Sequence, residues 1–360
     1  MRGILTLVFL VCQITGYSQS EKPNFNKETL LYEGEEKHLS NVQQLTFGGD
    51  NAEAYFSFDG KKITFQATNK SWGDECDQIY WHNLSDGGMH NKPTLISTQK
   101  GRTTCSYFMP GDQSILYAST HASSASCPAV PEKRSDGKYV WPIYDSFDIY
   151  ISDLNGKIIH QLTNNPGYDA EATVSAQGDK IVFTSTRSGD LELYTMDIDG
   201  SNVKQITNQL GYDGGAFFSP DGKQLIFRAS RPSTPEAIKE YKDLLKDGLV
   251  KPTEMDLYVV DVDGSNLKKI TSFANAEWAP FFHPSGKKVI FASNYKATRG
   301  IPFNLFMIDL NGENIEQITF DGMFDAFPMF SPDGKKLIFS SNRNNNGTHE
   351  TNLFIADWID

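Results

Sequence analysis

Short runs of apolar and aromatic residues alternate with polar turn sequences along nearly the whole chain. The pattern is clearest in Phe217–Phe227 (FFSPDGKQLIF) and Met329–Phe339 (MFSPDGKKLIF). In both segments a run of strand-forming residues lies on each side of a Pro-Asp-Gly turn, which predicts a β-hairpin. Related sequences occur six times, with their turn glycines at Gly60, Gly111, Gly178, Gly222, Gly286 and Gly334. The intervals range from 44 to 67 residues, and a base period of about 45 residues is typical of propeller blades.

Two further strands are expected in each unit. A third strand, such as Leu191–Asp197, leads into an Asp-Gly or Asn-Gly turn, and a short fourth strand ends in Gln-Leu-Thr or a related sequence. The sixth unit ends after its third strand, Asn352–Trp358, whereas Val42–Thr46 carries the Gln-Leu-Thr ending before the first unit. We therefore expect the N-terminal strand to complete the last blade and close the ring, which removes two open sheet edges. The alternative is a stray strand on an open array.

The sequence thus predicts an all-β protein, a six-bladed β-propeller of four-stranded blades over residues 42–360, after a lead-in over residues 19–41. Its repeats resemble the TolB-like six-bladed β-propeller family, which carries the same Phe-Ser-Pro-Asp-Gly-Lys and Ser-x-Arg signatures. Units two and three depart from the pattern, with Pro110-Gly111-Asp112 and Ala176-Gln177-Gly178 at the turn. The family includes periplasmic envelope proteins, propeller parts of peptidases and oligogalacturonate lyases. The resemblance therefore implies the fold and leaves the activity open.

The N-terminus is typical of a secretory signal. Met1-Arg2 precedes an apolar run over Ile4–Val11, and small residues follow at Gly16 and Ser18. We expect residues 1–18 to be removed and the protein to be periplasmic or secreted. A lipid anchor at Cys12 is the alternative, but Val11 stands where a lipoprotein signal has a small residue. No later stretch approaches the roughly 20 apolar residues of a membrane span.

The charge balance narrows the range of partners. The chain has 45 acidic and 33 basic residues and a formal net charge of -12. Nucleic-acid binding needs clustered Lys and Arg, and none is present, so we expect no nucleic-acid partner. The charge is compatible with a protein, peptide or glycan ligand. We expect the protein to be monomeric.

Two long insertions are expected on one face of the propeller. Residues 122–146 and 232–254 both lie between the second and third strands of a unit, and such loops share a face. The second insertion contains an amphipathic segment, 235–246, which predicts a helix with Ser233 as its N-cap. Long loops in a compact domain are commonly functional, so a lidded cleft is expected on this face.

Three sets of equivalent positions place polar side chains near the lidded face. Alignment of the units gives Asn51, Thr103, Asp169, Asp213, Glu277 and Asp325 near the start of the first strands, and Asn69, His121, Arg187, Arg231, Tyr295 and Arg343 after the second strands. Ion pairs between blades are the commoner role for such Asp and Arg residues. Residues that break the repeat are better candidates for ligand binding: Glu53 and Glu171, two positions after the first set, together with His121 and Arg102.

Three cysteines map near the same face. In an exported protein, a disulfide from Cys76 or Cys105 to Cys127 would fasten the first insertion, and the sequence does not choose between the two pairings.

Two functions follow from these features. The first is a binding protein without catalytic activity, because the chain contains no known hydrolase or nucleotide-binding signature. The second is a lyase or hydrolytic enzyme acting on an acidic oligosaccharide, with His121 as base, Arg102 or Arg231 opposite a substrate carboxylate, and Glu53 or Glu171 holding a divalent cation. No cofactor is predicted for the first function.

Overall fold

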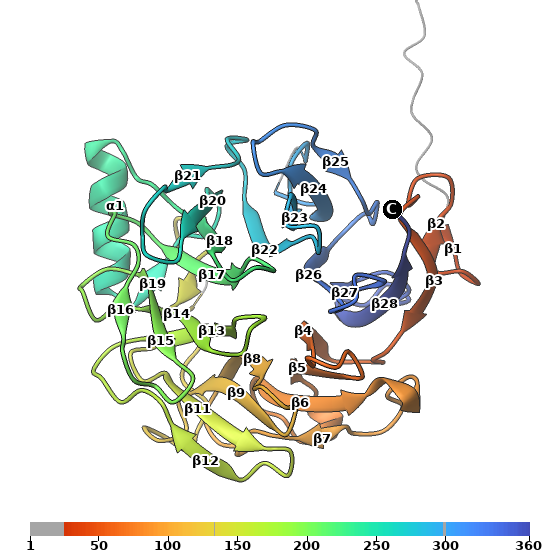
Figure 1. The fold of residues 1–360 in the computed structure, drawn as a ribbon, viewed down its shortest axis with the longest axis horizontal. Coiled ribbons are helices and arrows are strands. Elements are labelled where there is room, and N and C mark those ends of the chain that lie inside the picture. The colour runs from red at the N-terminus through yellow and green to blue at the C-terminus, as the bar shows by residue number, and fades with distance from the viewer. Residues whose placement is uncertain (1–24, 133, 298–299) are drawn as a thin grey trace, which may run out of the picture.

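The computed structural model describes residues 25–132, 134–297 and 300–360. Six four-stranded antiparallel sheets stand around a common axis (Figure 1), which confirms the predicted six-bladed propeller. The expected signal peptide and Cys12 lie outside the described residues. Among the described helices, none is long and apolar enough to cross a membrane.

The two inner strands of each blade form the predicted hairpins. In chain order these are β4 (Asp50–Phe56) and β5 (Lys62–Thr68), β8 (Thr103–Phe108) and β9 (Ser114–Ser119), β13 (Asp169–Val174) and β14 (Lys180–Ser185), β17 (Asp213–Phe218) and β18 (Gln224–Ala229), β22 (Glu277–Phe282) and β23 (Lys288–Ser293), and β26 (Asp325–Phe330) and β27 (Lys336–Ser341).

The outer strands complete the sheets. They are β6 (Gln78–Asn83) and β7 (Thr94–Leu95), β11 (Asp148–Asp153) and β12 (Ile158–Gln161), β15 (Glu192–Asp197) and β16 (Lys204–Gln205), β20 (Asp256–Asp261) and β21 (Lys268–Lys269), β24 (Asn304–Asp309) and β25 (Glu316–Gln317), and β28 (Asn352–Trp358) and β3 (Leu39–Gln44). The last pair closes the ring, because β3 lies antiparallel to β28. The closing strand ends two residues before the predicted Thr46 and begins three residues earlier than predicted.

The hydroxyl residue that follows each fourth strand, Thr in five blades and Ser97 in the first, explains why that sequence recurs. Its hydroxyl accepts a hydrogen bond from the backbone nitrogen of the third strand, as Thr207 does from Leu193 at 2.9 Å. Thr46 makes the equivalent contact with Leu353 of the last blade at 2.8 Å. The N-terminal strand therefore reproduces the internal contact of an ordinary blade.

The hairpin turns are fixed in a similar way by their own side chains. In the turn after β17, Ser219 Oγ donates to Asp221 Oδ1 at 2.7 Å and accepts from the nitrogen of Gln224 at 2.9 Å. Gly222 has φ +71°, which a residue with a Cβ adopts only with strain. The Ser-Pro-Asp-Gly sequence thus encodes a turn that reverses the chain on the face opposite the insertions.

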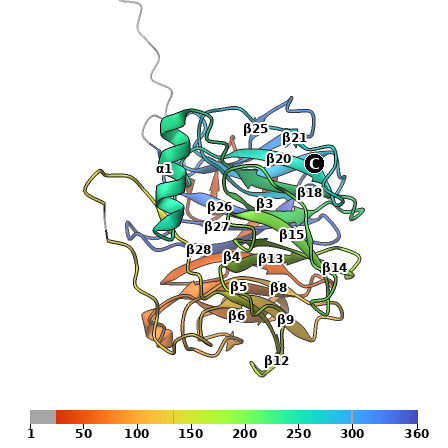
Figure 2. The ribbon, with the colours of Figure 1, turned by 90° about the vertical axis from the view of Figure 1, so that its left-hand side faces the viewer.

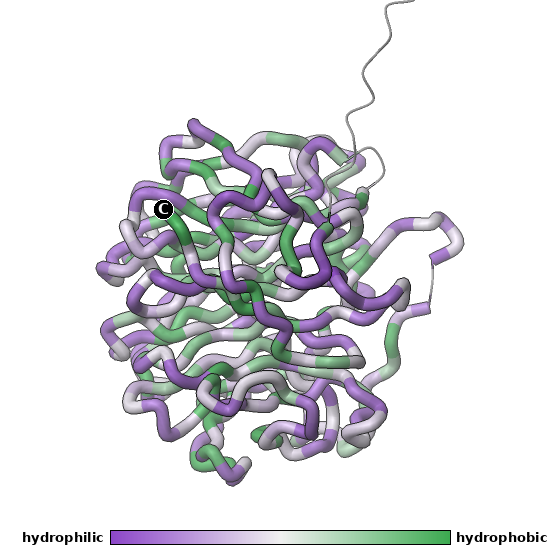
Figure 3. Tube along the Cα trace, turned by 90° about the vertical axis from the view of Figure 1, so that its right-hand side faces the viewer, coloured by the Kyte–Doolittle hydropathy of each residue, from purple (hydrophilic) through white to green (hydrophobic). Residues whose placement is uncertain are grey.

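Buried hydrophobic side chains form clusters within and between the sheets. The trace coloured by hydropathy shows apolar stretches in the strands and polar ones in many outer turns (Figure 3). The same position of each second strand carries a fully buried ring, at Phe65, Tyr117, Phe183, Phe227, Phe291 and Phe339. In three blades an arginine that follows the second strand stacks on rings of its own blade. Arg187 lies 5.0 Å from the ring centroid of Phe183, Arg343 lies 4.9 Å from that of Phe339, and Arg231 covers Tyr258.

The lead-in folds against the last blade. Strands β1 (Phe25–Asn26) and β2 (Leu31–Tyr32) form a small hairpin, and Glu36 follows it. Arg343 donates to Glu36 at 2.9 Å and to Asp325 at 3.3 Å, and all three side chains are completely buried. The lead-in thus supplies one carboxylate of a buried ion network that joins the two ends of the chain.

Both insertions lie on one face of the propeller (Figure 2). The second contains helix α1 (Pro235–Lys246), whose N-cap is Thr234 rather than the predicted Ser233, because the Thr234 hydroxyl accepts from the nitrogen of Ala237 at 3.2 Å. The insertions pair with each other through β10 (Trp141–Pro142) and β19 (Leu249–Val250). Of the two pairings left open for Cys127, the structure contains Cys76–Cys127, and Cys105 is a free thiol. We call residues 122–146 the lid.

We expect Glu36→Gln to lower the free energy of unfolding by about 3 kcal/mol, because removing one partner of a buried ion network leaves the other charge poorly compensated. Denaturant unfolding measures the change. The matched control is Asp197→Asn, since Asp197 pairs with Lys180 within blade three, where both side chains are partly exposed; we expect a much smaller loss there. Equal losses in the two variants would contradict the coupling of the lead-in to the ring.

Candidate functional site

Each innermost strand contains one residue in the left-handed backbone conformation. These residues are Glu53 (φ +53°), Cys105 (+47°), Glu171 (+56°), Gly215 (+60°), Ala279 (+48°) and Phe327 (+54°). At each of them the pairing with the second strand shifts register, as between Ala52 and Tyr55 in the first blade. A bulge of this kind redirects a side chain, and left-handed non-glycine residues are concentrated at functional sites.

All six of these residues line one cavity of about 480 Å³, which we call the central cavity. The lid contributes Tyr139, Trp141 and Tyr144 to the same lining. The predicted lidded cleft is therefore present, with the bulges of the innermost strands on one side and the lid on the other.

The lining of the central cavity differs between the two halves of the ring. The first three blades supply Glu53, Cys105 and Glu171 from their bulges, whereas the last three supply Gly215, Ala279 and Phe327. Trp278 and Phe324 enlarge the apolar half. A ligand in this cavity would therefore meet carboxylates on one side and aromatic surface on the other.

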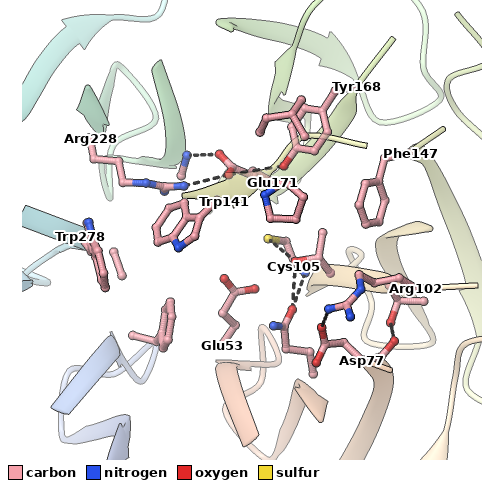
Figure 4. A pocket seen from close by; sticks show the side chains of 18 of the residues that line it. Glu53, Asp77, Arg102, Cys105, Trp141, Phe147, Tyr168, Glu171, Arg228 and Trp278 are labelled. Atoms are coloured by element: carbon pink, nitrogen blue, oxygen red, sulfur yellow. Dashed lines mark hydrogen bonds and ion pairs between the residues drawn. The ribbon is translucent and has the colours of Figure 1, made fainter. Parts of the chain in front are cut away.

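Glu171 is held in a dense network of hydrogen bonds. Its carboxylate accepts from Arg228 at 2.8 Å, from Thr184 at 2.9 Å and from the nitrogen of Gly215 at 2.6 Å. The Tyr212 hydroxyl also donates to it. With these partners, Glu171 is a charged group whose position is fixed (Figure 4).

The two consecutive glycines of β17 make room for this network. A Cβ on Gly215 would lie 1.7 Å from Nη1 of Arg228, and one on Gly214 would lie 2.3 Å from the Glu171 carboxylate. Arg228 itself stacks on Trp141 of the lid, 5.4 Å from the ring centroid. The network therefore connects blades three and four with the lid.

Glu53 differs from Glu171 because it forms no ion pair with the described residues. Its Oε2 atom is buried and accepts no hydrogen bond from the described residues. Burial raises the pKa of Glu53 to about 7; the Cys105 thiol lowers this pKa, whereas the charge of Glu171 raises it further. Figure 4 shows the side chain directed between Trp141 and Cys105.

Other polar groups of the central cavity have partners, although the Nε atoms of Arg102 and Arg228 make no hydrogen bond with the described residues. Arg102 forms an ion pair with Asp77 from the loop before β6. The backbone nitrogen of Cys105 donates to Gln66 at 3.2 Å. Burial, together with the charges of Glu53 and Glu171, raises the pKa of the Cys105 thiol well above its ordinary value, so the thiol is protonated at neutral pH.

The predicted Asp and Arg positions form ion pairs outside the central cavity. Arg187 pairs with Asp169, Arg231 with Asp213 and Arg343 with Asp325, and each pair lies within one blade rather than between blades as expected. Glu277 is fully buried and bonds to Thr271 and Ser293. The backbone of the same positions also links neighbouring blades, as in the bond from Asp213 nitrogen to Leu191 oxygen at 3.0 Å, and the Thr271–Glu277 bond joins blades four and five. None of these seven side chains lines the central cavity; Arg231 lines a separate cavity of about 460 Å³ beside α1.

His121 also lies apart from the central cavity. Its ring shares a hydrogen bond with Ser119 at 2.9 Å and packs on Tyr150, with ring centroids 4.4 Å apart. Burial lowers its pKa.

Of the candidates, the structure thus brings together Glu53, Glu171 and Arg102, and it separates His121 from them. Within the described residues, no group of three or more His, Cys, Asp or Glu side chains is placed to hold a metal ion.

Arg228, Trp141 and Trp278 belong to the site but were not selected from the sequence. Arg228 did carry a signal, because the equivalent positions of the other units hold Gln66, Ala118, Thr184, Ala292 and Ser340. Nothing in the sequence distinguished Trp141 or Trp278 as site residues. Trp141 reaches the site only through the pairing of β10 with β19.

We expect Glu53→Gln to stabilise the protein increasingly as pH rises from about 4.5 to about 7. The raised pKa means that the folded state holds the Glu53 proton more tightly than the unfolded state, so ionisation disfavours folding across this window. The gain should reach on the order of 1–3 kcal/mol above pH 7 and vanish at pH 4. Chemical unfolding of both proteins at several pH values measures it, and a difference independent of pH would contradict the assignment.

Comparison with solved structures shows the same fold in distant relatives. A putative TolB from Agrobacterium tumefaciens is 20% identical, with 87% of this chain and 91% of that chain covered and a TM-score of 0.53. TolB from Acinetobacter baumannii is 19% identical with a TM-score of 0.51; 86% of this chain is covered, and the match spans only 64% of that longer chain. At such identities the likeness shows the fold alone.

An oligogalacturonate lyase in complex with manganese is 13% identical, with 89% of this chain and 90% of that chain covered and a TM-score of 0.45, which is too low to support an argument about activity. Among curated proteins, none matches this sequence. The family model of the TolB beta propeller domain matches residues 142–240 and 249–349, together more than half of the chain. The chain therefore belongs to the TolB β-propeller family.

Proposed function

We propose that this is an exported binding protein, periplasmic or secreted, which holds a segment of a protein, peptide or glycan in the central cavity beneath the lid. The observation that carries the proposal is the convergence of six bulge residues and three lid aromatics on one cavity. Apolar cavities with a few placed polar groups are the usual form of ligand sites.

The aromatic lining supplies contact surface of the kind that dominates binding. The ring centroids of Trp141 and Trp278 lie 5.0 Å apart, and the Trp278 indole nitrogen donates to the oxygen of Pro252 at 2.9 Å. Tryptophan is among the residues that contribute most to interfaces, because a rigid ring buries a large area. Both rings therefore suit the apolar parts of a peptide or the faces of a sugar.

The lid is attached at both ends, which favours a site formed before the ligand arrives. The disulfide Cys76–Cys127 ties its beginning to the first blade, and β10 ties its end to β19 of the other insertion. The nitrogen of Ile143 extends this pairing by donating to the oxygen of Gly248 at 2.7 Å. A rigid lid lowers the entropy lost on binding.

One observation favours an enzyme as the second candidate. The pKa of Glu53 is about 7, a value suited to general acid or base catalysis. In that role Glu53 would replace the expected His121, which does not line the cavity. Analysis of a bound ligand distinguishes the two functions, because a binding protein releases it unchanged.

We expect purified protein to select members of a displayed peptide library or an oligosaccharide array, and Trp141→Ala to weaken their binding by tenfold or more, because tryptophan truncation removes a large contact. Calorimetry measures the affinities. The control is Phe47→Ala, an aromatic residue that is 44% exposed and lies outside the central cavity. The proposal would be contradicted if Trp141→Ala left the affinities of the ligands unchanged, or if no ligand were selected. Mass spectrometry of the recovered ligand tests for turnover.

We expect the double substitution Cys76→Ser and Cys127→Ser to lower the affinity for the same ligands several-fold, because a loosened lid must be ordered during binding. Thermal unfolding of the double variant checks that the propeller remains folded at the assay temperature. An unchanged affinity in a folded variant would show that the disulfide does not organise the site.

A further inference from the structure

The central cavity contains one more negative than positive side chain. Its ionisable acids are Glu53, Asp77 and Glu171, and its basic residues are Arg102 and Arg228. Two ion pairs, Arg102–Asp77 and Arg228–Glu171, use four of these five charges. Among the described residues, Glu53 is the carboxylate of the cavity that forms no ion pair.

The fold holds this uncompensated carboxylate in place. The left-handed conformation at Glu53 directs its side chain into the cavity, and Oε2 is buried without a hydrogen-bond partner among the described residues. A buried carboxylate without a partner is unfavourable for folding. The left-handed bulge is common to all six blades, so what distinguishes Glu53 is a carboxylate oxygen that faces the cavity without a hydrogen-bond donor among the described residues.

The aromatic residues of the cavity would also attract a cationic ligand. The faces of aromatic rings attract cations, and Trp best of all. The cavity already contains one such contact, because the guanidinium group of Arg228 lies over Trp141. Tyr139 and Tyr144 of the lid add further rings to the lining.

We propose that the central cavity selects an organic cation, in which an ammonium or guanidinium group pairs with Glu53 and an apolar body packs on Trp141 and its neighbours. Lysine and arginine side chains of a peptide have this chemistry. The inference rests on the proposed function, since it names the class of ligand for the same cavity. An anionic ligand is disfavoured because both arginines are already paired with carboxylates.

The ionisation of Glu53 should make the affinity for a cation depend on pH. The charged or titratable groups that act on it are the Cys105 thiol, Glu171, Arg228 and Asp77, from four different segments around the cavity. Because its pKa is about 7, the ionised fraction rises about tenfold between pH 6 and pH 8. Affinity for a cation should rise by a similar factor, and a neutral ligand should show no such change.

Three probes of one shape test the inference: 2-phenylethylamine, 2-phenylethanol and phenylacetate, titrated into the full-length protein by fluorescence or calorimetry. We expect the amine to bind roughly tenfold or more tightly than the alcohol at pH 8, and the acid most weakly. Glu53→Gln should abolish the preference for the amine over the alcohol, whereas Phe47→Ala, outside the cavity, should leave that preference unchanged. Glu53→Asp should restore part of the preference, and the pH dependence of amine binding should disappear in Glu53→Gln.

The outcomes separate this inference from the proposed function. If the three probes bind equally, or if the preference survives in Glu53→Gln, the cation inference is wrong, whereas the cavity remains a ligand site. If none of the probes binds and Trp141→Ala also leaves library ligands unaffected, both are wrong. If the probes fail while Trp141→Ala weakens neutral or acidic library ligands, the proposed function stands and the cation inference fails.

Discussion

The pairing of β3 with β28 is the contact on which the rest of this structure depends. Six twisted sheets can surround one axis only if the last meets the first, and here both chain ends share a single blade. The Thr46–Leu353 bond and the buried network of Glu36, Arg343 and Asp325 hold the two ends together. Without that closure the innermost strands would not face one another across a cavity. The arrangement also leaves no open sheet edge at the junction.

A repeated scaffold produces a site here by varying one backbone position. All six innermost strands turn the same residue inward through a left-handed bulge, so the scaffold offers six equivalent places around the cavity. The residue types at these places differ: blades one to three carry Glu or Cys, whereas blades four to six carry Gly, Ala or Phe. The lid completes the asymmetry, because its aromatic residues reach the cavity from the second blade alone.

Two carboxylates, Glu36 and Glu53, lie in contrasting electrostatic surroundings. Glu36 lies fully buried with Arg343 and accepts a bond from the nitrogen of Tyr32, so its charge is compensated. Glu53 forms no ion pair within the described part of the chain, and burial raises its pKa. The first arrangement fixes the lead-in on the last blade. The second leaves an unfavourable charge that a ligand can relieve, a common conflict between stability and function.

The sequence by itself determined the blade repeat, the ring closure, the helix of the second insertion and the face that carries the site, because turns and strand alternation are local properties of neighbouring residues. It also pointed to Glu53, Glu171 and Arg102, which break the repeat. Only the tertiary structure decided that Arg228 pairs with Glu171 across two blades, that Trp141 faces Trp278, and that His121 lies apart. These contacts join residues distant in the chain, and their geometry depends on how β10 meets β19 and on the space left by Gly215, which no local pattern records.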